Sequence, residues 1–415
     1  MKSLLILGAG TAGTMVANKL RPRLDEAEWT ITVVDQDDDH IYQPGLLFLP
    51  FGHYSRKELT KPRRRFLPEG VQSIIGEVDV IKAADSTVTL TDGRSLAYDQ
   101  LVIASGTHPT PEETPGLGAG EPGWYETVFD FYSMDGAEAL RDALARFEGG
   151  KVVVNITELP IKCPVAPLEF TFLADSFFAD NGMRDKVDLT FVTPLPGAFT
   201  KPVASKQLGT MLEERDIALE ADFFLERVDG GDGKIVSYDE REIDFDLLVT
   251  VPVNMGAAFV GRSGLGDELR HVPVDKHTFL STQYDNVFAI GDAANLPTSK
   301  AGSVAHFAVD VFVDNFLDHI GGRPMTESFD GHANCFIESG SGKGLLIDFN
   351  YDTEPLTGSF PLPVVGPMSL LKETRLNHLG KLAFRWIYWH LLLRGRPLPV
   401  PTHMSMTGKQ LAVLD

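Results

Sequence analysis

The chain has 415 residues, of which 43% are hydrophobic, and its formal net charge is −21 at pH 7. This length allows two or three domains with a large core, and the apolar fraction excludes global disorder. The acidic charge argues against nucleic acid as a partner, because proteins that bind phosphate backbones normally carry a basic face. The two cysteines are too few for a disulfide-stapled scaffold or a four-thiolate metal site, so no metal is expected, but they are enough for a redox pair.

The N-terminal residues predict a β-strand and no signal peptide. Residues 1–7 superficially resemble a signal sequence, but the apolar run breaks at once into a glycine-rich turn. No stretch of the chain approaches the roughly 18 to 20 apolar residues that a membrane span needs.

The glycine-rich turn predicts a dinucleotide site, because it stands between a strand and a helix, and the next strand (residues 31–34) ends in an acid. Gly8 permits the tight turn, Gly10 lets the backbone approach a pyrophosphate, and Gly13 allows close packing of helix on strand. Asp35 is expected to accept hydrogen bonds from the adenosine ribose. The alternative, a chance glycine-rich turn, would not explain this context.

Two later segments extend this pattern. Residues 98–106 predict a buried strand leading into a turn of small residues, and residues 286–293 predict another strand that ends in Gly-Asp. Together the segments resemble the flavoprotein disulfide reductase superfamily with two dinucleotide-binding domains, in which the second aspartate binds the ribityl-phosphate side of FAD. The resemblance implies FAD as the cofactor and a contact of Val78 with its adenine. The residues expected to bind FAD are Gly8, Gly10, Gly13, Asp35, Val78, Ala104, Ser105, Gly106, Gly291 and Asp292.

A second Rossmann-like unit is expected from residue 151 to 275, with strands near residues 152–154, 189–193 and 247–251. A relative that uses NAD(P)H would place glycines directly after Val154, but this chain continues with Asn-Ile-Thr-Glu-Leu-Pro. Without a glycine turn the backbone cannot cradle a pyrophosphate, and Glu158 would repel it. The second unit is therefore expected to lack a functional NAD site.

These features predict an α/β fold with two Rossmann-like domains and a C-terminal membrane-association region. The expected division is a first part of the FAD domain (1–110), a connecting segment (111–150), the second Rossmann-like domain (151–275), a second part of the FAD domain (276–325) and a C-terminal region (326–415).

The cysteines lie at the expected domain seams. Cys163 is predicted to stand at or near the start of a helix, beside Lys162, which would depress its thiol pKa. Cys335 lies in a strand-and-turn context after the FAD region. A buried, inert cysteine is the alternative for each, but their number and placement suggest a redox pair.

Three segments resemble the sulfide:quinone oxidoreductases: residues 159–170 around Cys163, residues 291–307, and residues 334–344 around Cys335. The flavoprotein of flavocytochrome c sulfide dehydrogenase is a close second, and the resemblance covers nearly the whole chain. It implies that the two cysteines lie on one face of the flavin ring and that quinone binds at the other, near Lys300, Phe307 and Phe336. Lys300 is expected to bind FAD and to stabilise the anionic reduced flavin.

The resemblance also implies a mechanism. Hydrosulfide attacks a sulfur bridge between Cys163 and Cys335, Cys335 is the thiolate on the flavin side, and the flavin then passes electrons to quinone. Glu169, expected two turns into the helix after Cys163, is the candidate proton acceptor, with a structural carboxylate as the alternative. Many family members carry a third cysteine where this chain has Tyr132, so a mechanism that needs three thiols is excluded.

The C-terminal region combines basic and apolar residues. Six basic residues stand against one acid between residues 367 and 396, interleaved with leucines and aromatic residues. Cationic amphipathic helices of this type lie in a bilayer interface, which predicts a peripheral protein of a prokaryotic cell membrane. The alternative is a core or dimerisation helix, so a homo-oligomer stays open. The basic residues are Lys372, Arg375, Lys381, Arg385, Arg394 and Arg396.

Hydrogen sulfide, quinone and membrane lipid are therefore the expected partners. A type II NADH:quinone oxidoreductase is the main alternative, against which the missing glycines and the paired cysteines argue. Electron delivery to a cytochrome c and a flavin-bearing assembly or sensor protein are the others.

Overall fold

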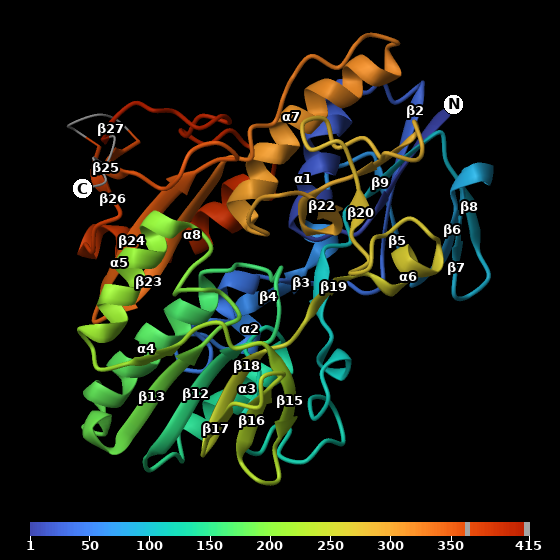
Figure 1. The fold of residues 1–415 in the computed structure, drawn as a ribbon. Coiled ribbons are helices and arrows are strands. Elements are labelled where there is room, and N and C mark those ends of the chain that lie inside the picture. Colours follow the sequence, from blue (N-terminus) through green and yellow to red (C-terminus); the bar gives the residue numbers. More distant parts are fainter. Residues whose placement is uncertain (362–365, 411–415) are drawn as a thin grey trace.

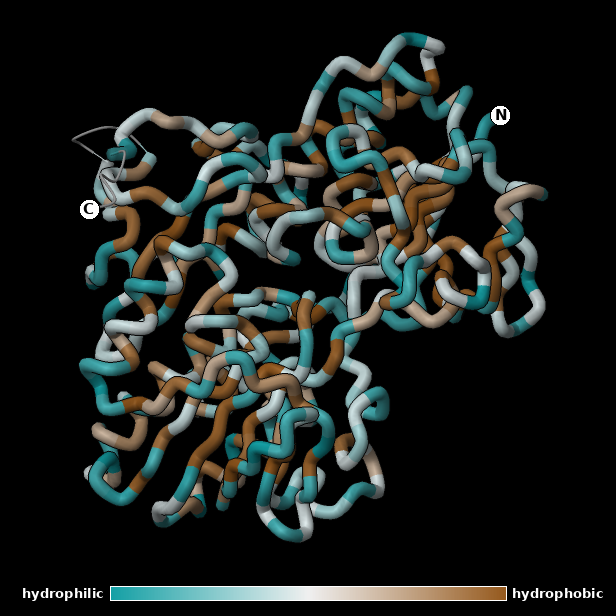
Figure 2. Tube along the Cα trace, viewed as in Figure 1, coloured by the Kyte–Doolittle hydropathy of each residue, from teal (hydrophilic) through white to brown (hydrophobic). Residues whose placement is uncertain are grey.

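The computed structural model describes residues 1–361 and 366–410, and its framework consists of three five-stranded sheets (Figure 1). The first two sheets are wholly parallel and the third is mixed. Figure 2 shows hydrophobic residues gathered along the strands of these sheets and hydrophilic residues on the outer loops.

The first sheet has the order β21-β9-β1-β2-β5, so residues 287–289 add an edge strand to a sheet that the N-terminal 103 residues otherwise build. In β1, Leu4 and Ile6 pack with the helices α1 and α7 on one face, whereas Leu5 and Leu7 pack with the β6-β7-β8 meander on the other. Burial on both faces is typical of parallel sheets. The elements of this unit are β1 (Lys2–Leu7), α1 (Thr11–Leu20), β2 (Trp29–Asp35), β5 (Val71–Ile75), β6 (Val78–Lys82), β7 (Thr87–Leu90), β8 (Ser95–Ala97), β9 (Gln100–Ile103), β21 (Val287–Ala289) and α7 (Gly302–Ile320).

The second sheet has the order β11-β18-β12-β13-β14, and its strands β12, β13 and β18 lie where the sequence predicts them. The segment 111–150, expected to be a connection, contributes β11 and α3 to this unit, because the apolar face of α3 is buried in the core. The elements are β11 (Val128–Phe129), α3 (Met134–Leu144), β12 (Gly150–Ile156), α4 (Ala166–Asp180), β13 (Val187–Val192), α5 (Pro202–Glu213), β14 (Ala218–Glu220), β15 (Leu225–Asp229), β16 (Lys234–Ser237), β17 (Glu242–Asp244) and β18 (Leu247–Val251).

Helix α4 is buried almost throughout, because it lies between the second sheet and strand β23 of the third (Figure 1). The third sheet has the order β23-β24-β26-β25-β27, and α8 packs on β23 and β24. Its elements are β23 (Ala333–Gly340), β24 (Lys343–Phe349), β25 (Thr357–Phe360), β26 (Met368–Leu370), α8 (Arg375–Ile387) and β27 (Lys409–Gln410). Shorter elements connect the units: β3 (Asp39–Ile41), α2 (Arg56–Leu59), β4 (Thr60–Pro62), β10 (Thr107–Pro109), β19 (Asn254–Gly256), α6 (Ala258–Arg262), β20 (Val272–Pro273) and β22 (Ala294–Asn295).

The C-terminal region only partly follows its predicted amphipathic pattern. Helix α8 turns an apolar stripe outward, in which Leu379 is 56% and Trp386 59% exposed. The following turn faces inward, because Trp389 and Leu392 are buried in the main hydrophobic core. Within residues 1–361 and 366–410, no helix combines the length and the hydropathy that crossing a bilayer requires.

Tyr388 anchors this last turn to the glycine-rich turn. Its hydroxyl lies 2.7 Å from the Thr11 hydroxyl and 2.7 Å from Nε2 of His40. Burial lowers the pKa of His40 to about 3, so the ring is neutral. The C-terminal region is therefore fixed to the first turn of α1.

Candidate active site

A cavity of about 480 Å³ is lined by residues from all three units. Gly13 and Cys335 are the two predicted site residues that are not part of its lining. The predicted residues that do line it are Gly8, Gly10, Asp35, Val78, Ala104, Ser105, Gly106, Cys163, Glu169, Gly291, Asp292 and Lys300.

The three glycines of the first turn have different tasks. Gly8 adopts a φ of +105°, and a β-carbon at Gly13 would lie 1.9 Å from the carbonyl oxygen of Gly8. Around the place where a β-carbon of Gly10 would lie, in contrast, the described residues other than its chain neighbours leave 4 Å of open space. The open side of Gly10 faces the cavity at the N-terminus of α1, where a phosphate group is favoured.

This difference makes Gly10 and Gly13 a matched pair for mutation. Gly10→Ala is expected to leave unfolding unchanged but to weaken cofactor binding by about 1.4 kcal/mol or more, which is tenfold, because the methyl group enters the space of the phosphates. Gly13→Ala is expected to destabilise the apoprotein by about 1–3 kcal/mol through overpacking. Flavin content after purification and the unfolding midpoint of the apoprotein measure the two effects. Full cofactor retention by Gly10→Ala would contradict this assignment.

The polar groups around the cavity fit a dinucleotide cofactor. Asp35 is held by the backbone N–H of Ala9 (2.6 Å) and by Arg63 (3.0 Å), at the end of β2. The Ser105 hydroxyl is buried without a hydrogen-bond partner within the described residues. Burial raises the pKa of Asp292, an effect that Lys300 and Lys162 oppose. A bound dinucleotide could donate ribose or ribityl hydroxyl groups to Asp35 and Asp292 and give the Ser105 hydroxyl a hydrogen-bond partner.

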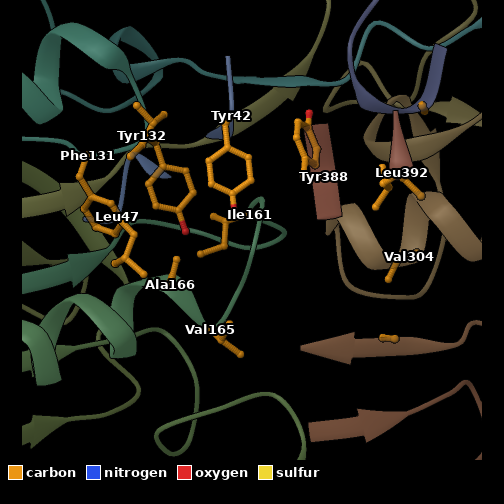
Figure 3. Close-up of a cluster of buried hydrophobic side chains, with 14 of the residues drawn as sticks. Tyr42, Leu47, Phe131, Tyr132, Ile161, Val165, Ala166, Val304, Tyr388 and Leu392 are labelled. Carbon is orange, nitrogen blue, oxygen red and sulfur yellow. The ribbon is translucent and has the colours of Figure 1, made fainter. Parts of the chain in front are cut away.

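Cys163 lies three residues before α4, with a φ of +47°. Its N–H donates to the Lys300 carbonyl (2.7 Å), and its own carbonyl accepts from the hydroxyl of Tyr132 (3.2 Å). Tyr132 thus holds the backbone of Cys163. Figure 3 shows the Tyr132 ring with Ile161 and Ala166, which stand on either side of Cys163 in the sequence.

The expected depression of the Cys163 pKa is wrong. Burial raises the pKa of this thiol far above its usual range, and Glu169 raises it further, while Lys381 opposes the shift. The helix start and the adjacent Lys162 do not offset burial, because α4 begins only at Ala166. The neutral thiol is therefore the favoured form.

Cys335 lies on β23, opposite Ile347 of β24, and is a free thiol like Cys163. Burial raises its pKa to about 12, with Lys381 lowering it and Glu169 raising it. Lys381 and Glu169 thus act on the pKa of both thiols, and Cys335 also raises the pKa of Cys163. The fold brings the two cysteines to one buried ion pair.

Glu169 lies in the first turn of α4 and not two turns into it, because the helix begins later than predicted. It is fully buried, pairs with Lys381 of α8 and accepts a hydrogen bond from the N–H of Glu338 (2.6 Å). All of this engages Oε1, so Oε2 has no hydrogen-bond partner among the residues described. Although burial lowers the pKa of Lys381, Glu169 and Cys163 raise it more, which keeps the ammonium charged.

Sequence reasoning missed Lys381, which it assigned to a membrane-facing charge. The sequence signal was the spacing of Lys381, Phe384 and Tyr388, which places them on one helical face. In the structure these three residues line the cavity. Phe307 and Phe336, expected near the quinone, do not line it. Phe307 instead stacks on His332, with ring centroids 4.0 Å apart.

The ammonium of Lys300 is held by the backbone. Its Nζ donates to the carbonyls of Asp292 (2.8 Å) and Ala294 (3.1 Å), and burial lowers its pKa. Lys162, which the sequence analysis considered only as a neighbour of the Cys163 thiol, also lines the cavity.

Comparisons with known proteins agree with this geometry. The profile of the pyridine nucleotide-disulphide oxidoreductase family matches residues 2–155. The chain is 29% identical to the mitochondrial sulfide:quinone oxidoreductase of Dictyostelium discoideum, over 95% of this chain and 86% of the relative. It is 27% identical to the mouse mitochondrial protein of that name, over 94% of this chain and 86% of the relative. The chain resembles the sulfide:quinone oxidoreductases.

A solved structure supports the same fold. The sulfide:quinone oxidoreductase of Aquifex aeolicus superposes with a TM-score of 0.77 at 19% identity, covering 95% of this chain and 92% of that one. The predicted α/β fold, the resemblance to this family and the prediction of an enzyme are confirmed. The prediction of a prokaryotic membrane is not supported, because relatives from Dictyostelium, mouse and Schizosaccharomyces pombe are mitochondrial.

Proposed function

We propose that the protein is an FAD-dependent sulfide:quinone oxidoreductase that oxidises hydrogen sulfide to sulfur or polysulfide and passes the electrons to membrane quinone. The observation that carries the proposal is the placement of Cys163 and Cys335 beside the Glu169–Lys381 pair, at a cavity whose polar groups fit FAD. The names of the relatives support the same substrates.

The cysteines carry the sulfur chemistry. In the oxidised protein they form a bridge; hydrosulfide attacks one sulfur, so that one cysteine becomes a persulfide and the other leaves as a thiolate. Two electrons are released for each sulfur atom oxidised. Bound FAD would accept this electron pair and pass it to quinone, which takes up two protons. Cys335 is assigned as the flavin-side thiolate by its family resemblance.

Glu169 is assigned as the proton acceptor. Burial favours the neutral form of both thiols, so the proton of hydrosulfide or of a thiol needs a nearby base. The Oε2 atom of Glu169 is buried without a partner in residues 1–361 and 366–410, and Glu169 lines the cavity. Lys381 binds this carboxylate through Oε1, which leaves Oε2 available for the proton.

Anaerobic titration of the purified protein tests the proposal. Sulfide is expected to bleach the flavin absorbance, and a short-chain quinone is expected to restore it. A protein whose flavin is unchanged by sulfide would contradict the proposal. NADH is the control, because a type II NADH:quinone oxidoreductase would be bleached by it, and here the loop after β12 offers no glycine turn for a pyrophosphate.

We propose that α8 binds the membrane that holds the quinone. Its apolar stripe is exposed, and four of the six basic residues of the region are exposed beside or beyond it. The stripe is Leu376, Leu379, Leu382 and Trp386, and the four exposed basic residues are Lys372, Arg375, Arg394 and Arg396.

The double variant Leu379→Ser/Trp386→Ser is expected to weaken binding to anionic liposomes roughly a hundredfold, from about 1.5 kcal/mol per buried side chain. Phe224→Ser is the matched control, because Phe224 is also exposed (57%) but lies in the second unit. Sedimentation with liposomes measures both. Equal loss in the two variants would contradict the assignment of α8.

A further inference from the structure

Lys162 is buried against the cavity without a partner for its charge. Its residue is 9% exposed and lines the cavity beside Cys163. Its backbone N–H donates to Oδ1 of Asn254 (3.2 Å), and its strand bridge with Lys300 fixes its position. Within residues 1–361 and 366–410, its Nζ forms neither an ion pair nor a hydrogen bond.

The ammonium groups of the other two lysines that line the cavity already have partners. Lys381 is paired with Glu169, and Lys300 donates to two carbonyls. Burial lowers the pKa of Lys162, and Asp292, Asp130 and Cys163 oppose this shift without forming a hydrogen bond or ion pair with its ammonium in the described residues. An unpaired cation this far from bulk water is unfavourable, so the Lys162 ammonium is available to pair with an anionic group that enters the cavity.

We infer that Lys162 is the cation that stabilises the negative charge of the reduced flavin ring. The glycine turn and the N-terminus of α1 are the place for the phosphates, whereas Lys162 stands at the thiol end of the cavity. A flavin that reaches from Asp292 to Cys163 would bring its ring to this ammonium. Lys300, the sequence-based candidate, would then hold the backbone of the Asp292 turn.

The test uses the FAD-loaded protein and compares Lys162→Met with Lys162→Arg and Lys300→Met. One readout is the two-electron reduction potential of the flavin, measured against a reference dye. The other is the dissociation constant for sulfite, an anion that adds to oxidised flavin more tightly when a cation is near. Lys162→Met is expected to weaken sulfite binding at least tenfold and to lower the potential by about 30 mV per tenfold change. Lys162→Arg is expected to restore most of both.

Lys300→Met is expected to change both values less than Lys162→Met does, because the Lys300 ammonium already donates to two carbonyls. An unchanged potential and sulfite affinity in Lys162→Met, or a larger loss in Lys300→Met, would overturn the inference. Lys162→Gln serves as a second neutral variant if the methionine variant retains too little FAD. The inference rests on the proposed function only for the presence of FAD. Because neither readout uses sulfide or quinone, a protein that sulfide cannot reduce would refute the proposed activity and not this role of Lys162.

Discussion

Cys163→Ser is expected to lower the rate of flavin reduction by sulfide on the order of a thousandfold or more. Serine cannot form the bridge to Cys335 or carry the persulfide, so the electron pair has no route from sulfur to the flavin. The rate is measured by stopped-flow absorbance under anaerobic conditions. Dithionite, which needs no thiol, is expected to reduce the flavin of the variant at the normal rate.

Tyr132→Phe is the matched control for this prediction. It removes only the hydrogen bond to the carbonyl of Cys163 and leaves both sulfurs in place. Its reduction by sulfide is expected to stay within about tenfold, the effect of one lost hydrogen bond of roughly 0.5–1.5 kcal/mol. If Cys163→Ser were reduced by sulfide as fast as the unsubstituted protein, the thiol mechanism would be wrong.

Lys381→Met is expected to destabilise the protein by about 3–5 kcal/mol, because it leaves the charge of Glu169 buried without its counter-ion. The urea midpoint of the apoprotein measures the effect. The variant is also expected to react more slowly with sulfide, because Lys381 lowers the pKa of both thiols.

The double variant Lys381→Met/Glu169→Gln separates charge from packing. It removes both charges, so its urea midpoint is expected to lie closer to that of the unsubstituted protein than the midpoint of Lys381→Met does. Arg385→Met is the surface control: Arg385 lies one turn away on α8, and its ion pair with Glu58 is long (3.9 Å) and partly exposed. A Lys381→Met midpoint as high as that of Arg385→Met would contradict the importance of the buried pair.

The dinucleotide fold was predictable because its signals are local. The spacing of Gly8, Gly10 and Gly13 and the strand runs around them encode the turn, the helix and the sheet without reference to the rest of the chain. The loss of glycines after β12 was equally visible. These features account for the position of the cavity and for most of its lining.

The chemistry inside the cavity was less predictable because it depends on contacts between distant segments. The ion pair of Glu169 and Lys381 joins α4 to α8, and the sequence around either residue does not indicate that the two are in contact. The Cys163 pKa was predicted in the wrong direction because local sequence shows the neighbouring lysine but not the depth of burial. Lys300 was assigned to the flavin by family resemblance alone, since only the fold reveals that its ammonium already donates to two carbonyls.

The hydroxyl contact of Tyr388 with Thr11 and His40 has a practical consequence for anyone who wants a soluble fragment. A truncation before residue 388, made to remove the apolar C-terminal region, would also remove the Tyr388 hydroxyl that contacts Thr11 at the start of α1. Such a fragment is expected to lose its flavin, although the cut lies more than 370 residues away from the glycine turn in the sequence. Substituting only the exposed apolar side chains of α8 with polar ones keeps the Tyr388 contact and is the better way to obtain a flavin-loaded protein with a less apolar surface.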